Sequence, residues 1–170
     1  MIQVKRSPLT ASEWITPAVA KEWLRVDGDA DDMLIASLIT QVRELAEEFL
    51  QRSIARQHIT LTASRGVYVL PYGPIDKIVS VKNEDGDDVD YSYDGLYLTI
   101  PGVVYSVTAG SSPETVTIEY EAGGSIPAGL ILALKQVLMN YYENRHDDGD
   151  IVHMVYSNAG LQVYRNKLWF

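Results

Sequence analysis

The strongest constraint on the fold is the helical spacing of the apolar residues between positions 34 and 49. They recur at i, i+3 and i+4, which is typical of an amphipathic helix with one buried face: Leu34, Ile35, Leu38, Ile39, Val42, Leu45, Ala46 and Phe49. We expect this helix over about residues 32–52, with Asp31 or Asp32 as its cap. The charged residues fall mainly on the opposite face: Arg43, Glu44, Glu47 and Glu48.

Two further helices are predicted. Thr16 is suited to cap a short helix that begins at Pro17, carries Val19, Trp23 and Leu24, and ends before Gly28. A second long helix is expected over about residues 127–145, opened by Pro127, and its apolar face carries Leu130, Ile131, Leu134, Val137, Leu138 and Tyr141. Since each long helix has one apolar face, we expect the two to pack together, with the intervening chain as an excursion.

The residues between the long helices are rich in strand patterns. Candidate strands are 57–62, 66–70, 78–82, 90–93, 96–100, 105–108 and 115–121, separated by turns that contain Gly, Pro, Asn and Asp. The last alternates clearly, with Val116, Ile118 and Tyr120 on one face. Short strands with tight turns predict an antiparallel sheet or small sandwich. The fold class is therefore α+β. We expect one domain over residues 1–170, made of a helical frame (16–52 and 127–145), a β-rich insertion (54–121) and an extended C-terminal tail (146–170).

The charge balance argues against a protein that grips nucleic acid. The net charge is −9, from 23 acidic and 14 basic side chains, without a basic run that could neutralise phosphates. DNA could still slide past such a surface without sticking. The chain has no cysteine, so disulfides and thiol catalysis are excluded. No apolar stretch approaches the ~20 residues of a membrane span, and the first residues lack the apolar run of a signal peptide.

No motif indicates catalysis, and we predict no catalytic residue, metal or cofactor. The loop from Asp27 to Asp32 superficially resembles a calcium loop, but Asp32 and Leu38 stand where the signature needs Gly and Glu. A solvated loop with a capping aspartate explains it better. His146, Asp148 and His153, with Asp147 and Asp150, form a second polar cluster. This cluster fits a polar loop after a helix, and a metal-dependent hydrolase site is the less favoured alternative.

The C-terminal segment carries large apolar groups that should dock somewhere rather than remain in water. They are Leu161, Val163, Tyr164, Leu168, Trp169 and Phe170. Docking on the chain's own domain and docking on a neighbouring subunit or partner both remain open.

Three segments resemble the head–tail connector (adaptor) proteins of long-tailed bacteriophages. The first runs from Leu24 and Asp27 through Asp32, Leu34 and Ile35; the second is Glu48-Phe49-Leu50-Gln51-Arg52-Ser53-Ile54; the third runs from Ile126 and Pro127 to Tyr142 and Arg145. Together they cover the helical frame at both ends in the expected order. The β region is longer than in the compact members and is similar to that of the longer ones.

The resemblance implies a homo-oligomeric, dodecameric ring that binds the portal protein below the capsid. Such a ring extends the channel for double-stranded DNA without binding it specifically, and presents a surface to a head-closure or tail protein. Assembly would take place in the bacterial cytoplasm, without a membrane. The C-terminal apolar group is then expected to contact the portal or an adjacent subunit. Alternatives are another virion assembly part (a head-closure or tail-completion protein), a ligand-binding module that uses the tyrosine-rich β region, and the hydrolase above.

Overall fold

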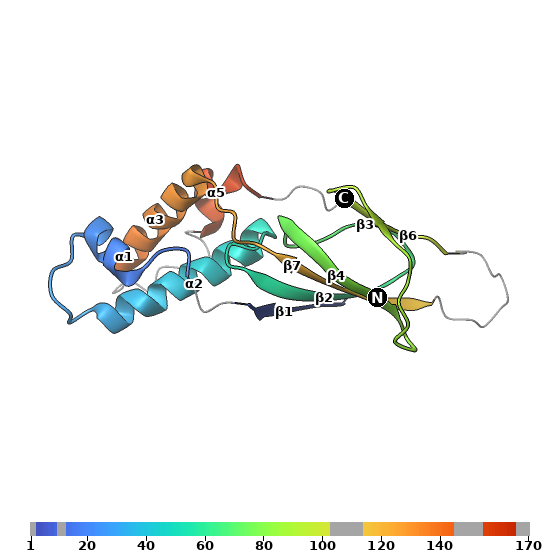
Figure 1. Cartoon of the computed structure of the whole chain (residues 1–170). Coiled ribbons are helices and arrows are strands. Elements are labelled where there is room, and N and C mark those ends of the chain that lie inside the picture. The colour runs from blue at the N-terminus through green and yellow to red at the C-terminus, as the bar shows by residue number, and fades with distance from the viewer. Residues whose placement is uncertain (1–2, 10–12, 103–113, 145–154, 166–170) are drawn as a thin grey trace. The chain divides into compact units, whose positions relative to one another are not determined.

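The computed structural model describes residues 3–9, 13–102, 114–144 and 155–165 (Figure 1). The chain divides into two compact units. The β unit consists of Met1–Thr10 and Arg56–Gly123, and the helical unit of Ala11–Ala55 and Gly124–Phe170. The helical unit is thus assembled from both sides of the β region, as a frame with an insertion requires. The predicted α+β class is confirmed, while the assignment of residues 1–170 to one domain stays a prediction.

The helices of the helical unit begin and end close to their predicted positions. Helix α1 spans Pro17–Leu24, and the Thr16 hydroxyl accepts a hydrogen bond from the Val19 N–H at 3.4 Å, which confirms the predicted cap. Helix α2 spans Asp32–Leu50 and ends at Gln51, whose φ of 52° is left-handed. Helix α3 spans Ala128–Glu143, and a short helix, α5, spans Ala159–Gln162. No helix in the described part of the chain is long and apolar enough to cross a membrane.

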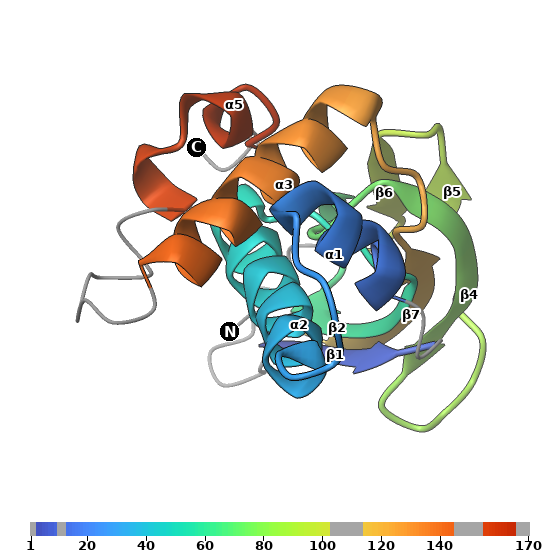
Figure 2. The ribbon, with the colours of Figure 1, turned by 90° about the vertical axis from the view of Figure 1, so that its left-hand side faces the viewer.

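The expected packing of the two long helices is confirmed, because α1 and α3 both lie against α2 (Figure 2). Their apolar faces form one core, whose fully buried members include Ile35, Ile39, Val42, Leu134, Val137 and Leu138. Trp14 closes this core, and its indole N–H donates to the carbonyl of Ile39 at 3.1 Å.

The β unit contains two antiparallel sheets. The larger has the order β1 (Gln3–Pro8), β2 (Gln57–Ser64), β7 (Thr115–Ala122) and β4 (Ile75–Asn83); the smaller has the order β3 (Gly66–Val69), β6 (Tyr97–Ile100) and β5 (Ser92–Tyr93). Strand β1 was not expected, because Val4 is its only strongly apolar residue and the segment shows no clear alternation. The predicted strand 105–108 lies outside the described residues.

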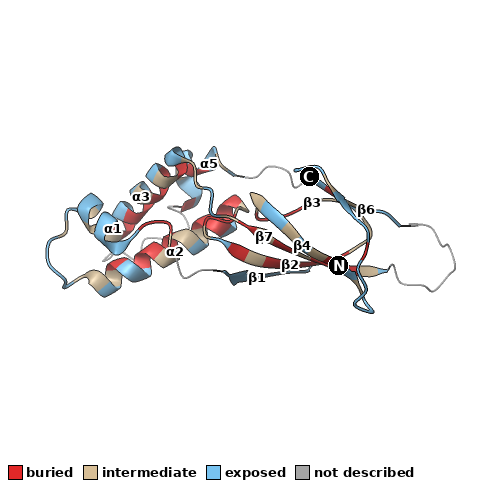
Figure 3. Ribbon diagram, viewed as in Figure 1, coloured by how far each residue is buried: buried red, intermediate tan, exposed pale blue. Residues whose placement is uncertain are grey.

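Alternation along β2 and β7 places their apolar residues in a single core (Figure 3). Val116, Ile118 and Tyr120 are buried while the intervening threonines and glutamates are partly exposed, as expected. Leu98 and Ile100 of the smaller sheet belong to the same core. The unit is therefore a small sandwich, which is one of the two architectures that short strands with tight turns predict.

Glu47 is the clearest departure from the helical pattern. It was expected on the polar face of α2 but is buried, with 1% of its surface exposed. Its Oε1 accepts the backbone N–H groups of Ile54 at 2.8 Å and Ala55 at 3.0 Å, just after the helix. Backbone donors buried away from water need an acceptor, and Glu47 supplies it. The prediction for this residue was wrong because local periodicity does not include the returning chain.

Candidate assembly surfaces

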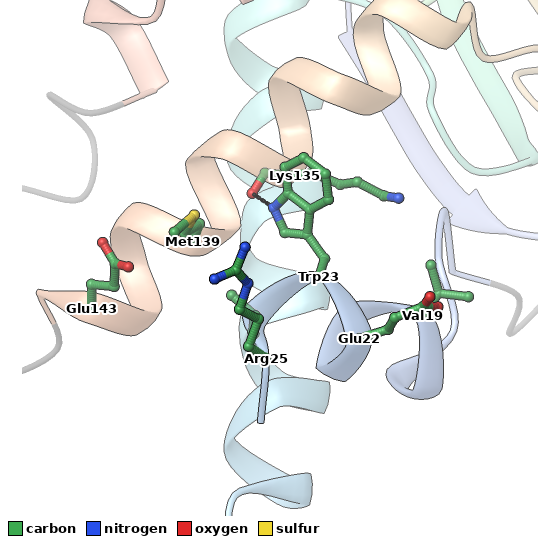
Figure 4. Close-up of a pocket in the computed structure, with 8 residues that line it drawn as sticks. Val19, Glu22, Trp23, Arg25, Lys135, Met139 and Glu143 are labelled. Atoms are coloured by element: carbon green, nitrogen blue, oxygen red, sulfur yellow. Dashed lines mark hydrogen bonds between the residues drawn. The ribbon is translucent and has the colours of Figure 1, made fainter. Parts of the chain in front are cut away.

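A groove lies between α1 and α3 in the helical unit, with a volume of about 710 Å³ (Figure 4). Trp23 reaches from α1 to α3, where its indole N–H donates to the backbone carbonyl of Lys135 at 3.2 Å. The ammonium of Lys135 lies 5.2 Å from the centroid of the Trp23 ring, a cation–π distance. These contacts hold the indole in one orientation while 36% of the residue remains exposed.

The rim of this groove combines apolar and charged side chains. Val19 and Met139 are exposed beside Trp23, and Glu22, Arg25 and Glu143 add charges of both signs. Exposed apolar groups framed by polar ones are typical of protein–protein contacts. The sequence places Val19 and Trp23 on a helix but does not indicate this groove, because its opposite wall comes from α3, more than a hundred positions away.

The family-motif positions described by the structure mostly build the helical unit. Ile35 is in its core, and Leu24, Leu34 and Ile126 pack against that core. Pro127 immediately precedes α3, Asp27 is exposed, and Arg145 lies outside the described residues. The motif positions thus stabilise the helical frame and do not form a chemical site.

Two acidic motif-region residues have structural partners. Asp32 pairs with the Lys21 ammonium at 2.6 Å, and this hydrogen bond raises the pKa of Lys21. Asp31 stands at the N-cap position of α2 but makes no capping hydrogen bond to the helix; its carboxylate instead accepts from the Tyr142 hydroxyl. The N-terminal end of α2 is therefore tied to α1 and α3 by acidic side chains.

The predicted C-terminal interface residues do not share one environment. Leu161 is fully buried in the helical core, and Tyr164 packs against that core with its hydroxyl close to Gly129. Val163 is 77% exposed. Leu168, Trp169 and Phe170 lie outside the described residues. Leu161 and Tyr164 thus anchor the segment to its own unit. A role of the group at an interface stays a prediction.

The described residues contain no group of three or more His, Cys, Asp or Glu side chains placed to hold a metal ion. The other polar cluster considered for a metal, from His146 to His153, lies outside the described residues. The described residues thus form packed helices, a sandwich and exposed surfaces.

Comparison with known proteins agrees with this geometry. The model of the head completion protein family matches residues 13–151, which is most of the chain and includes all three motif segments. The chain belongs to the head completion protein family. This confirms the resemblance to head–tail connector proteins, and the protein is a structural head–tail connector component of a phage-like virion. The family match ends before Leu161, so the apolar C-terminal group of this head completion protein lies beyond it.

Solved structures share the fold of this head completion protein. A chain in the neck of an empty GTA particle, computed with C6 symmetry, superposes with a TM-score of 0.67 at 16% identity, over 95% of both chains. A chain in the virion of a native gene transfer agent (GTA) particle gives 0.60 at 17% identity, over 90% of this chain and 94% of that one. A chain in the neck of a native GTA particle, computed with C12 symmetry, gives 0.56 at 16% identity, over 95% of both chains. Comparison with curated protein sequences gave no match.

Proposed function

We propose that this head completion protein forms a ring of identical copies, dodecameric in its expected form, that attaches below the portal and links the capsid to the tail. The observation that carries this proposal is the family match over residues 13–151. The shared fold supports it, since two of the similar chains belong to GTA necks computed with C6 and C12 symmetry. The protein acts by assembly in this proposal, and no catalytic step is required.

A closed ring needs a head-to-tail contact between two unlike surfaces of each copy. The chain offers such surfaces within each of its units: the mixed apolar and charged groove between α1 and α3, and the two different edges of the four-stranded sheet. The net charge of −9 is suited to a channel that double-stranded DNA crosses without binding, because acidic surfaces repel phosphates. Assembly in the bacterial cytoplasm is part of the same proposal.

The C-terminal segment is the proposed contact with the portal or an adjacent subunit. Leu161 and Tyr164 hold the start of this segment against the helical core, and Val163, which lies between them in sequence, points its apolar side chain into solvent. Leu168, Trp169 and Phe170 add large apolar groups of the kind that dominate protein–protein contacts. Val163 and these three residues are therefore the part of the predicted group that we assign to the interface.

The proposal is tested by the mass of the purified protein, alone and mixed with the portal ring of the same virion, measured by light scattering on a sizing column. We expect either a ring in the free protein or a portal peak heavier by about twelve copies, as closed cyclic assembly requires. A mixture in which the protein stays monomeric and the portal peak is unchanged would contradict it. In that case the protein is mixed with the tail protein, and binding to it would indicate a tail-completion role.

A further inference from the structure

A single methionine projects from the outer face of α2. Met33 is 89% exposed, more than any other large apolar residue in the described part of the chain. It stands two positions before the buried Ile35, which is about 200° round an α-helix, so its side chain points away from the core. Ala36 and Ser37, on the same side of the helix, are exposed and small. Another chain can therefore approach this face closely and meet a flexible apolar side chain.

Two exposed carboxylates accompany this methionine. Asp27 and Asp29 lie in the loop before α2, and the Asp29 carbonyl accepts the Asp32 N–H at 3.2 Å, which holds the loop beside the first turn. The Asp32 hydrogen bond, with a smaller contribution from the charges of Asp29 and Asp27, raises the pKa of Lys21, whose ammonium is bound to Asp32 at 2.6 Å. Met33, Asp27 and Asp29 together form an acidic knob.

The groove between α1 and α3 opens on the opposite face of the same helical unit. Met139 stands two positions after the buried Val137, again about 200° round its helix, so the α3 wall of the groove faces away from the core. That core lies between α2 on one side and α1 and α3 on the other. Since the knob is on the outer side of α2, the two surfaces are unlike and face in opposite directions, as a head-to-tail contact requires.

Positive charge flanks the aromatic ring of this groove. In Figure 4 the guanidinium of Arg25 and the ammonium of Lys135 lie on either side of the Trp23 ring, while Glu22 and Glu143 lie farther out in this view. None of the ion pairs among the described residues includes either cation. The groove thus offers an apolar surface with cations that a carboxylate of another chain can approach.

We infer that the knob of one copy inserts into the groove between α1 and α3 of the next copy in the ring, an inference that rests on the proposed function. The Met33 thioether packs on the Trp23 ring, a favourable sulfur–aromatic contact. The two aspartates of the knob face Arg25 and Lys135. Charge selects the pairing, because two acidic knobs repel one another while knob and groove cations attract.

Disulfide cross-linking tests this contact directly, because the full-length chain contains no cysteine of its own. Met33→Cys is combined with Met139→Cys in one variant and with Val19→Cys in another. Rings, free or on the portal ring, are oxidised and run on a denaturing gel without reductant. We expect at least one pair to give a ladder of linked copies up to the ring number, since each copy is joined to both neighbours. A mixture of the two single variants of that pair should stop at two linked copies.

The control for cross-linking is Met33→Cys with Val67→Cys, because Val67 is an exposed apolar residue of the β unit and belongs to neither surface. We expect no ladder from this pair.

Charge substitutions give an independent measurement, followed by light scattering over a concentration series. Met33→Asp and, separately, Arg25→Asp should each raise the concentration needed for ring formation by about tenfold or more. Aspartate is favourable in the first turn of a helix and tolerates the left-handed conformation of Arg25, whose φ is 56°. Both variants should therefore keep the fold, which thermal unfolding checks. Val67→Asp should assemble like the wild type.

Absence of a ladder from both cysteine pairs in assembled rings, or assembly of Met33→Asp at wild-type concentrations, would overturn the inference and leave the proposed function standing. Loss of portal binding in Arg25→Asp but not in Met33→Asp would show that the groove takes the portal instead, and would also overturn it. A wild-type protein that forms no ring even with the portal would defeat the proposed function itself.

Discussion

The Oε1 atom of Glu47 accepts the backbone N–H of Ile54 at 2.8 Å, which joins the last turns of α2 to the chain that leaves it. The same oxygen accepts the N–H of Ala55, and the other carboxylate oxygen pairs with Arg43 at 3.2 Å. Arg43 in turn binds Glu13 at 2.8 Å. One buried carboxylate thus ties the segment before α1, the helix α2 and the exit from α2 into a single network.

Replacing Glu47 with alanine should destabilise the helical unit by about 3 kcal/mol, since the change leaves two backbone donors without their acceptor and removes one of the carboxylates that pair with Arg43. Glu47→Gln keeps an acceptor oxygen and should cost less, about 1 kcal/mol. Urea unfolding measures both. The control is Glu48→Ala at the exposed neighbouring position, expected within about 0.5 kcal/mol of the wild type. Equal losses for Glu47→Ala and Glu48→Ala would show that the network contributes little.

A pair of changes at Gly129 and Tyr164 probes the attachment of the C-terminal segment. A Cβ on Gly129 would collide with the Tyr164 hydroxyl but would meet the ring carbon beneath it at 3.4 Å, an ordinary contact. We therefore expect Gly129→Ala to cost about 1 kcal/mol through crowding, although alanine favours helices. The double variant with Tyr164→Phe should regain most of this loss. Thermal unfolding and hydrogen exchange of residues 159–165 provide the measurements, and additive effects of the two changes would contradict the predicted clash.

Tyr120 should make the β unit sensitive to alkaline pH. Its hydroxyl donates to the Pro71 carbonyl at 2.9 Å, and burial raises its pKa above the ordinary value of 10.0. The neutral form is thus favoured in the folded state, so this stability is fully present below pH 10.0 and declines as the pH rises further. The expected slope is about 1.4 kcal/mol per pH unit for one such group.

Tyr120→Phe tests this expectation by chemical unfolding between neutral and alkaline pH. At neutral pH it should lose about 1–2 kcal/mol, because the Pro71 carbonyl loses its donor. The free energy of unfolding of this variant should fall less steeply at alkaline pH than that of the wild type. Some decline should remain, because burial also raises the pKa of Tyr68 and Tyr93. The exposed Tyr97, changed to Phe, serves as control. An unchanged alkaline slope in Tyr120→Phe would refute the assignment.

Removal of residues 166–170 should weaken portal binding while the fold is preserved, because Leu161 and Tyr164, which pack on the core, are retained. A deletion after Asn158 would also remove these anchors, so a loss of portal binding could not be separated from a loss of stability. Val163→Asp changes an exposed residue and should act in the same direction. We expect each change to lower portal affinity by about tenfold or more, as loss of an apolar anchor does, measured by co-sedimentation.

Leu132→Asp is the control for this experiment, as it places the same charge on another exposed aliphatic residue of the helical unit. Portal binding equal to that of the wild type in both the truncated protein and Val163→Asp would refute a role of the C-terminal segment at this interface.

The helices could be predicted because their signals are local. The apolar spacing from Leu34 to Phe49, the cap at Thr16 and the proline at position 127 all act within one or two turns of the residues they organise. The alternation in β7 likewise assigns its buried face from the sequence. These patterns, in order along the chain, were also sufficient to indicate the family.

The surfaces could not be predicted in the same way, because each combines residues that are distant in sequence. Nothing near Trp23 indicates that Lys135 supplies the carbonyl for its indole N–H. Strand β1 is too polar to be recognised alone, and it forms because the edge of β2 offers backbone partners. The burial of Glu47 depends on where the chain turns after α2.

The amino-acid sequence by itself thus determined helices α1 to α3, the strands between α2 and α3, the α+β class and the membership of a virion assembly family, since periodicity and caps depend on neighbouring residues. Only the tertiary structure decided which polar groups are buried and which apolar groups stay exposed. Those outcomes depend on backbone hydrogen bonds and packing between distant segments, and neither leaves a local pattern in the sequence.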